Sequence, residues 1–282
     1  MRTVAVVSSC HRRGFETYGR RMLESFDQHW PQPVPLLFYA EDFVPDVRSA
    51  RILVRDLLPS CPGLADFKQR HAGSVLAHGA SRKWRPRLRL DHYQRRLRLD
   101  GLKWGRGFRW NAVRFAHKSF AVFHAARNCA ADVLVWVDAD MVFFDDIAPR
   151  EIESWIPADR LVGYLKRPTW SECGLVAYNL RHPQTAAMLS EFETLYTTDS
   201  LFRQDEFHDS YLFDRVRERA ERRGAVSHDI AEGIGFRAEH VLINSRLGRY
   251  MDHLKGPRKE RGRSSASDLI VHRDERYWSP DA

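Results

Sequence analysis

Cysteine is scarce in this sequence, and its spacing argues against the sites that cysteine usually builds. The four cysteines, Cys10, Cys61, Cys129 and Cys173, lie far apart and form no CxxC pair. Such spacing predicts neither a zinc site nor a disulfide framework. We therefore expect free thiols and a reducing compartment.

Long apolar runs are absent as well. No segment approaches the roughly 20 apolar residues that a membrane-spanning helix needs. The apolar run at residues 4–7 is short for a signal peptide, and no internal repeat or low-complexity tract is present. These absences favour a cytoplasmic protein, whose membrane contact, if it makes one, is peripheral and at the inner membrane face.

The charge is unbalanced toward the basic side. The chain has 45 Lys and Arg against 37 Asp and Glu, a formal net charge of +8. This predicts an anionic partner, which is nucleic acid, a membrane surface or a nucleotide-linked substrate. At 282 residues, the chain suits one domain over residues 1–263 with a basic insertion at 82–109. Residues 264–282 are expected as a C-terminal tail with Trp278 as its packing anchor.

Strand and helix patterns alternate along the first third of the chain. Residues 3–7, 36–39 and 52–54 are typical of strands, and residues 8–11 are expected as a loop after the first. Apolar residues at helical spacing before Pro31 predict a helix between the first two strands. This order indicates an α/β fold with a Rossmann-like, mixed but mostly parallel sheet flanked by helices.

The most informative stretch is DVLVWVDADMVFFDDI, residues 132–147. Its apolar run at 133–137 is typical of a strand covered on both faces. Asp138 and Asp140 follow two residues apart, so on an extended segment both lie on the same side. Two acids at the carboxyl edge of such a sheet can share a hard divalent cation. The alternative is a solvated turn after a core strand, since Asp is a turn former.

Two predicted helices carry polar candidates. The helix at 111–127 leads into the central strand and has Arg114 and Lys118 on one face, where they meet a diphosphate or are only surface charge. A helix beginning at 205–210 and ending at Gly224 carries Asp209, a candidate for substrate contact. Capping and the helix dipole alone also explain an acid there. Between these two predicted helices we expect strands at 161–165 and 174–178 and a helix opened by Pro183.

Residues 82–109 are rich in arginine and interleaved with aromatic residues, Trp84, Tyr93, Trp104 and Phe108. Such a composition fits a nucleic-acid surface, a mobile insertion that covers an anionic substrate, or a solvated helical face. We favour the last two over nucleic acid.

A late segment, MDHLKGPRKERGRS at 251–264, combines His253, Lys255, Gly256 and Lys259. An imidazole, two cations and a glycine that lets the backbone approach closely suit a diphosphate with its metal. A lone histidine is usually structural, but this combination in a chain with a DxD is more specific.

Taken in order, NAVRFAHK…VLVWVDADMVFF, CGLVAYNL and DHLKGPRK resemble motifs of the nucleotide-sugar-dependent glycosyltransferases of the GT-A fold. More narrowly, they are similar to the family-eight group of retaining galactosyl- and glucosyltransferases and the glycogenins. The resemblance implies a GT-A fold and a retaining hexosyltransferase. Its donor would be a nucleoside-diphosphate sugar, UDP-linked for preference, and its acceptor a saccharide or glycolipid in cell-surface polysaccharide synthesis.

The resemblance also implies roles for single residues. Asp138 would contact the metal or the donor ribose, and Asp140 and His253 would complete the protein ligands of a Mn²⁺ or Mg²⁺ ion. The remaining donor contacts would come from Val7, Ser8, Ser9, Arg114, Lys118, Lys255, Gly256 and Lys259. The chain departs from the pattern at Asp209-Ser210, where the family has Asp-Gln, which weakens the inference of retention. Residues 82–109 have no counterpart in the family.

On the acceptor side, Glu172 and Asp209 are candidates to orient or deprotonate the hydroxyl. Trp170 is a candidate to stack on a sugar face, although core packing explains it equally well. Two other functions compete. A DxD phosphotransferase of the haloacid-dehalogenase type wants Thr where this chain has Val142, and normally carries the motif on its first strand. A nucleic-acid or polyanion-binding protein would use residues 82–109, with the DxD as a structural turn.

Overall fold

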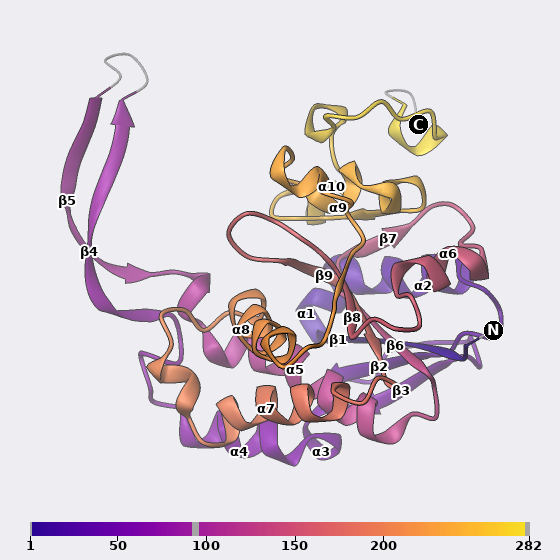
Figure 1. Ribbon diagram of the computed structural model, residues 1–282, viewed down its shortest axis with the longest axis horizontal. Helices are drawn as coiled ribbons and strands as arrows, with labels where there is room; N and C mark the ends of the chain where they lie inside the picture. The colour runs from indigo at the N-terminus through magenta and orange to yellow at the C-terminus, as the bar shows by residue number, and fades with distance from the viewer. Residues whose placement is uncertain (1, 92–95, 280–282) are drawn as a thin grey trace.

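The computed structural model describes residues 2–91 and 96–279, and their side chains outside 80–106. A seven-stranded sheet forms its centre, in the order β10-β8-β9-β6-β1-β2-β3 (Figure 1). Its strands are β1 Val4–His11, β2 Leu36–Glu41, β3 Ile52–Asp56, β6 Val133–Val137, β8 Val162–Leu165, β9 Glu172–Asn179 and β10 His228–Asp229. Only β9 runs antiparallel to its neighbours among these described strands. The predicted mixed, mostly parallel α/β sheet is therefore confirmed.

Helices cover both faces of this sheet. In Figure 1, α4, α5 and α7 lie below it and α2 and α6 above it. The α-helices are α1 Arg12–Gly14, α2 Arg20–His29, α3 Leu57–Ser60, α4 Pro62–Arg70, α5 Ala112–Asn128, α6 Pro149–Trp155, α7 Thr185–Thr197, α8 Asp209–Arg222, α9 Val241–Asn244 and α10 Arg258–Arg261. A π-helical turn, η1 Phe15–Gly19, joins α1 to α2.

The strand β6 shows why the sheet is sandwiched. All five of its residues are buried. Leu134 and Trp136 join the hydrophobic core on the α5 side, whereas Val133, Val135 and Val137 join the core on the α2 side. Because side chains alternate along a strand, an apolar run with no polar interruption needs cover on both faces. The predicted two-sided burial is confirmed.

A small second sheet brings the C-terminal part of the chain to the end of β6. β11 Met251–His253 pairs antiparallel with β7 Met141–Phe143, with His253 opposite Met141. The next residue continues the contact, because the Leu254 backbone N–H donates to the Asp140 carbonyl oxygen at 2.9 Å. The late segment predicted to bind a diphosphate is thereby fixed beside the DxD.

The C-terminal residues also pack beside β7. Trp278 is buried and its indole N–H donates to the Gly248 carbonyl oxygen at 2.8 Å, as predicted for a packing anchor. The Tyr277 ring stacks on Phe144 at 4.0 Å between ring centroids. The domain bounds at 263 and 264 stay a prediction.

Three predicted boundaries are wrong. The loop expected at 8–11 is part of β1, which pairs with β2 as far as His11 and Glu41. Short side chains such as Ser8 and Ser9 gave a loop-like pattern, but parallel pairing with a neighbour decides the backbone. The last predicted helix begins at Asp209, where His208 caps it, and α7 begins at Thr185, so Pro183 lies before its first turn.

The arginine-rich segment forms a two-stranded antiparallel ribbon, β4 Ala80–Asp91 and β5 Arg96–Arg106. In Figure 1 this ribbon extends away from the central sheet. A solvated helical face is therefore wrong for residues 80–91 and 96–106. The predictions that rest on the side chains of 80–106 lie outside the described residues, so the nucleic-acid and substrate-covering alternatives stay predictions.

No helix in the described part of the chain combines the length and the apolar character needed to cross a bilayer.

Candidate metal and substrate site

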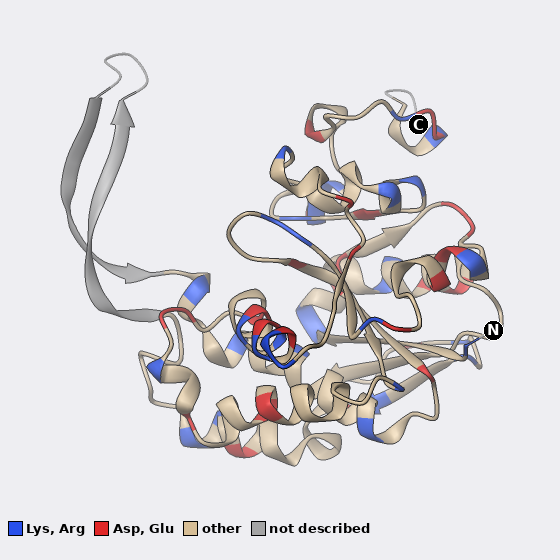
Figure 2. Ribbon diagram, in the orientation of Figure 1, with Lys and Arg blue, Asp and Glu red and all other residues tan. Residues whose placement is uncertain are grey.

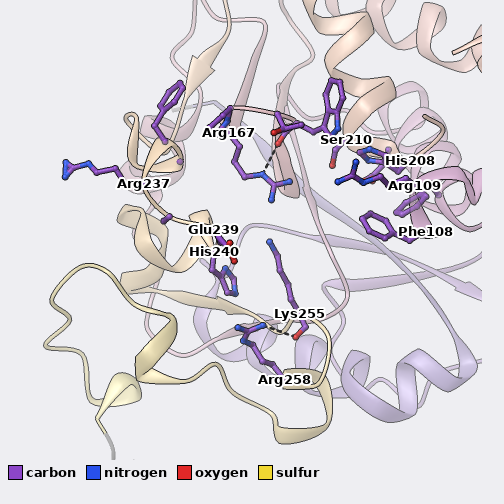
Figure 3. Close-up of a pocket in the computed structure, with 18 residues that line it drawn as sticks. Phe108, Arg109, Arg167, His208, Ser210, Arg237, Glu239, His240, Lys255 and Arg258 are labelled. Carbon is purple, nitrogen blue, oxygen red and sulfur yellow. Dashed lines mark hydrogen bonds between the residues drawn. The ribbon is translucent and has the colours of Figure 1, made fainter. Parts of the chain in front are cut away.

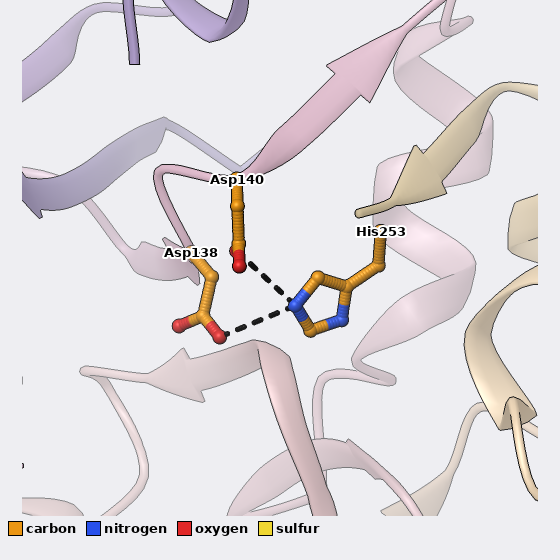
Figure 4. A group of neighbouring side chains, drawn as sticks. All are labelled: Asp138, Asp140 and His253. Atoms are coloured by element: carbon orange, nitrogen blue, oxygen red, sulfur yellow. Dashed lines mark ion pairs between the residues drawn. The ribbon is translucent and has the colours of Figure 1, made fainter. Parts of the chain in front are cut away.

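Two carboxylates and an imidazole meet at the carboxyl end of β6. Asp138 directly follows β6, Asp140 directly precedes β7, and His253 ends β11 (Figure 4). The His253 Nε2 lies 3.2 Å from Asp140 Oδ1 and 3.5 Å from Asp138 Oδ2. One ligand atom from each residue lies within 4.8 Å of the others. Two carboxylate oxygens and one imidazole nitrogen are a donor set that suits Mn²⁺ or Mg²⁺ better than a thiolate-preferring metal.

Asp140 is the buried acid of this cluster, with only 8% of its surface exposed. Its Oδ2 lies 2.6 Å from Lys259 Nζ. Burial alone would raise the pKa of the Asp140 carboxyl, but His253 and Lys259 outweigh it and hold the pKa below its usual range. At His253, the contacts with Asp140 and Glu172 outweigh burial and raise the pKa of the imidazole to about 9. The contacts in the cluster therefore favour an ionised Asp140.

Asp138 is hydrogen-bonded by residues other than those that hold Asp140. Its Oδ1 accepts hydrogen bonds from Trp136 Nε1 at 2.6 Å and from Lys118 Nζ at 3.0 Å. Lys118 is largely buried and also lies 2.8 Å from Asp209 Oδ2. Burial disfavours a charged amine, but Asp138 and Asp209 more than compensate and raise the pKa of Lys118. The predicted pair Arg114 and Lys118 therefore separates, because Arg114 is exposed whereas Lys118 ties β6 to α8.

Glu172, the first residue of β9, lies behind His253. It is buried, pairs with Lys255, and has Arg167 Nη1 at 3.6 Å. Its Oε1 is 3.3 Å from His253 Nδ1, which turns Nε2 of the ring toward the two aspartates. Burial opposes its ionisation, yet Lys255 and His253 hold the pKa of Glu172 well below its usual range. A carboxylate so stabilised is a weak base, and its contacts suit holding His253 in place.

The position of the His253 ring requires a glycine at residue 174. A Cβ at this position would lie 2.5 Å from both Nδ1 and Cε1 of His253, so even alanine displaces the ring. The Gly174 carbonyl oxygen also accepts from the Asp138 backbone N–H at 2.8 Å. Sequence reasoning missed this residue, because a glycine inside a strand pattern reveals a close approach without naming the group that approaches.

A large cavity of about 1090 Å³ opens beside the cluster. Its lining includes ten predicted site residues, Ser9, Arg114, Lys118, Asp138, Asp140, Glu172, Asp209, Lys255, Gly256 and Lys259. Val7 and Ser8 are fully buried in β1 and lie outside the lining. The volume slightly exceeds the upper end of the roughly 300–1,000 Å³ common for small-molecule sites.

Sequence reasoning missed the residues that line the large cavity at the end of β2. Glu41 is the last residue of β2 and contacts Lys68 and, at 3.3 Å, His117 Nε2. Burial opposes ionisation of Glu41, but His117 and Lys68 lower its pKa to about 2. The signal was available, since Glu41 is the first acid after an apolar strand, but the strand was expected to end two residues earlier.

A small cavity of about 650 Å³ adjoins the large one (Figure 3). The two share Phe108, Phe115, Arg167, Asp209, Ser210 and Lys255 in their linings. Trp170 lines the small cavity, half-buried, with Tyr211 at 4.7 Å between ring centroids and the Arg215 guanidinium 5.6 Å from its ring. Asp209 thus lies where the cavities meet, and Trp170 lines the small cavity but not the large one.

The sequence matches no family model, and no curated protein is significantly similar to it. Similar solved structures include mouse xyloside xylosyltransferase 1 in its apo form, at 10% identity and a TM-score of 0.47, covering 80% of this chain and 84% of that one. A glycosyltransferase involved in glycosylation of the major capsid of the virus PBCV-1 has 13% identity, a TM-score of 0.44 and coverages of 92% and 98%. The apo glycosyltransferase GlyE of Streptococcus pneumoniae has 10% identity, a TM-score of 0.41 and coverages of 82% and 46%. At these identities and scores the likeness establishes no activity.

Proposed function

We propose that this protein is a metal-dependent glycosyltransferase that uses a nucleoside-diphosphate sugar, with UDP favoured as the nucleotide. One observation carries the proposal. Asp138 and Asp140 of the Asp138–Asp140–His253 cluster line the large cavity, whose wall also holds Lys255 and Lys259. Carboxylates for a cation beside amines for phosphate are the two groups that a metal diphosphate needs.

Different residues of the chain would bind different parts of the donor. Asp138, Asp140 and His253 would hold the divalent cation, which when bound stabilises negative charge on the departing diphosphate as a Lewis acid. Lys259 lines the large cavity beside Asp140 and would bind the diphosphate oxygens. The end of β2, with Glu41 and His117, would receive the nucleoside.

The small cavity would receive the acceptor. Asp209 lies in the lining of both cavities and is the candidate to orient the acceptor hydroxyl, while Trp170 offers a ring to a sugar face. Burial opposes ionisation of Asp209, but Lys118 lowers the pKa of its carboxyl. An ionised Asp209 accepts a hydrogen bond from a hydroxyl, but it is a poor proton acceptor.

The finer parts of the proposal follow from the resemblance to family-eight enzymes of the GT-A fold. They are a hexose as the transferred sugar, retention of configuration, and a saccharide or glycolipid acceptor in cell-surface polysaccharide synthesis. The reaction would take place in the cytoplasm, with peripheral contact at the inner membrane face where a glycolipid is the acceptor.

Calorimetric titration of UDP and of GDP, each with and without Mn²⁺, tests the donor site. We expect metal-dependent binding of one nucleotide, which is lost in Asp140→Asn. Asp145→Asn is the matched control, because Asp145 is an exposed acid five residues along the same segment and does not line the large cavity. Failure of both nucleotides to bind in the presence of Mn²⁺ would refute the proposal.

A further inference from the structure

The small cavity is strongly basic. Its lining includes Arg109, Arg167, Arg237, Lys255 and Arg258 against the acids Asp209 and Glu239. Figure 3 shows Arg237 pointing away from the cavity, whereas the Arg167 guanidinium and the Lys255 amine point into it from opposite sides. In Figure 2 the two segments that face each other, the β8–β9 connection and the region of α10, both carry basic residues.

The acids that pair with these cations lie behind them. Arg109 contacts Glu206 at 3.2 Å, and Arg258 contacts Asp268 at 2.8 Å, yet neither acid lines the cavity. These contacts hold each guanidinium in one orientation, and the acid does not use all of its N–H donors. A planar fork of N–H groups that is fixed from behind suits a carboxylate or a phosphate better than a neutral hydroxyl.

The corner formed by Arg167 and Lys255 has a surplus of positive charge. Both cations share one buried carboxylate, Glu172, which also contacts His253. Arg167 uses its Nε to donate to the Trp170 carbonyl oxygen at 2.8 Å, and its Nη2 to donate to Ser171. One carboxylate therefore balances two cations at this corner, and both cations line the small cavity.

Side-chain amides, which often bind neutral sugars, are missing from the described wall of the small cavity. Among the described residues that line the small cavity there is no Asn or Gln. Aromatic rings are present, with Trp170, Phe108, Phe115 and Phe236 in the lining. A ring to cover a sugar face together with cationic forks describes a saccharide that itself bears a negative charge.

We propose that the acceptor is an anionic saccharide, whose carboxylate or phosphate is bound between Arg167 and Lys255 in the small cavity. This inference rests on the proposed function, because it takes the small cavity as the acceptor site. It names the chemical class of the acceptor and leaves the donor site untouched.

Ligand-observed NMR titration of the full chain, with diamagnetic Mg²⁺ and UDP present, tests this proposal. The probes are glucose, glucuronate, glucose 6-phosphate and inorganic phosphate. We expect glucuronate or glucose 6-phosphate to bind at least about tenfold more tightly than glucose, and the better of the two identifies the anionic group. Equal affinity for glucose would overturn the inference. Inorganic phosphate binding as tightly as the sugar phosphate would also overturn it, because the site would then select an ion and no sugar.

Two variants connect the preference to the small cavity. Arg167→Gln removes a cation at the centre of the proposed anionic site. Arg109→Gln removes a cation whose acid partner, Glu206, is not part of the metal cluster. Each should reduce the preference for the charged sugar by about tenfold or more. UDP affinity should be unchanged in Arg109→Gln, because Arg109 lines the small cavity and not the large one. Arg181→Gln, an exposed arginine paired with Asp132 at the opposite edge of the sheet, is the matched control.

If neither variant alters the preference, the charged sugar binds elsewhere and the inference fails. If the wild-type protein binds no UDP but still prefers the charged sugar, the donor assignment fails and the anionic-sugar site stands. The two failures are therefore distinguishable.

Discussion

The two adjoining cavities are built differently. The large cavity is lined by the ends of strands β1, β2, β6 and β9, and its acids and cations pair across it, as in Asp140 with Lys259 and Asp138 with Lys118. The small cavity is lined mainly by connections, at residues 167–170 and 235–240, and its cations have their acids behind the wall. Strand ends hold reacting groups in fixed geometry, whereas connections can vary with the substrate. The difference therefore suits a fixed donor chemistry beside an acceptor site of separate specificity.

The largest effect that separates the cavities is expected from Asp140→Asn. Replacing the buried carboxylate by an amide removes a proposed metal ligand and the acid nearest to both His253 and Lys259. We expect Mn²⁺ affinity measured by calorimetry to fall more than the roughly 100-fold that loss of a residue behind a ligand can cost. Anionic-sugar binding should remain within twofold of wild type. A variant that loses both would show that the cavities are one site.

Glu172→Gln should affect both cavities, because Glu172 contacts His253 on one side and Lys255 and Arg167 on the other. We expect Mn²⁺ affinity to fall by about 10–100-fold, since the His253 ring loses the carboxylate beside its Nδ1. If Glu172 instead acts as the acceptor base, Mn²⁺ affinity will stay unchanged and the pH profile of kcat will lose its acidic limb.

Gly174→Ala tests the close approach of β9 to His253. A Cβ at 2.5 Å from the imidazole requires the ring or the strand to move, which should destabilise the fold by about 1–3 kcal/mol. Urea unfolding and Mn²⁺ titration should both register the change. Gly224→Ala is an unsuitable control because of its positive φ, whereas Gly73, with open space around it, is suitable.

Trp170→Ala should act on the small cavity alone. We expect KM for the acceptor to rise by about 3–10-fold, in line with roughly 0.5–1.5 kcal/mol for an aromatic contact, and the affinity for UDP to be unchanged. Trp170→Phe should restore most of the loss. An unchanged KM for both variants would assign Trp170 to core packing with Tyr211.

The smallest effect is expected at Glu41, whose pKa of about 2 in the folded protein lies below the ordinary value of 4.5 for a glutamate. A carboxyl with a lowered pKa contributes stability that is fully present above pH 4.5 and is lost as pH falls toward 2. Glu41→Gln should therefore lower the urea midpoint at pH 6, and the gap to wild type should narrow between pH 5 and pH 3. A constant gap would show that packing alone accounts for the role of Glu41.

The elements that sequence reasoning found are those with a strong pattern of their own. The apolar run of β6 predicted both its strand and its burial, and Asp138, Asp140 and His253 were brought together as expected. Burial and partners were less accessible. Lys118 was expected, with Arg114, to meet a diphosphate or to be surface charge, and its contact with Asp209 of α8 was not predicted. Of the small cavity, only Trp170, Asp209 and Lys255 were predicted as site residues, because most of its wall comes from short connections without periodicity.

The pairing of β11 with β7 has a consequence for biosynthesis. Asp138 and Asp140 leave the ribosome long before His253, and the strand that carries His253 can join β7 only after the chain has been made to that point. The growing polypeptide therefore has an incomplete cluster during most of its synthesis. A nascent protein arrested before residue 251 should take up Mn²⁺ weakly, and full uptake should begin only when the last part of the chain has emerged and folded.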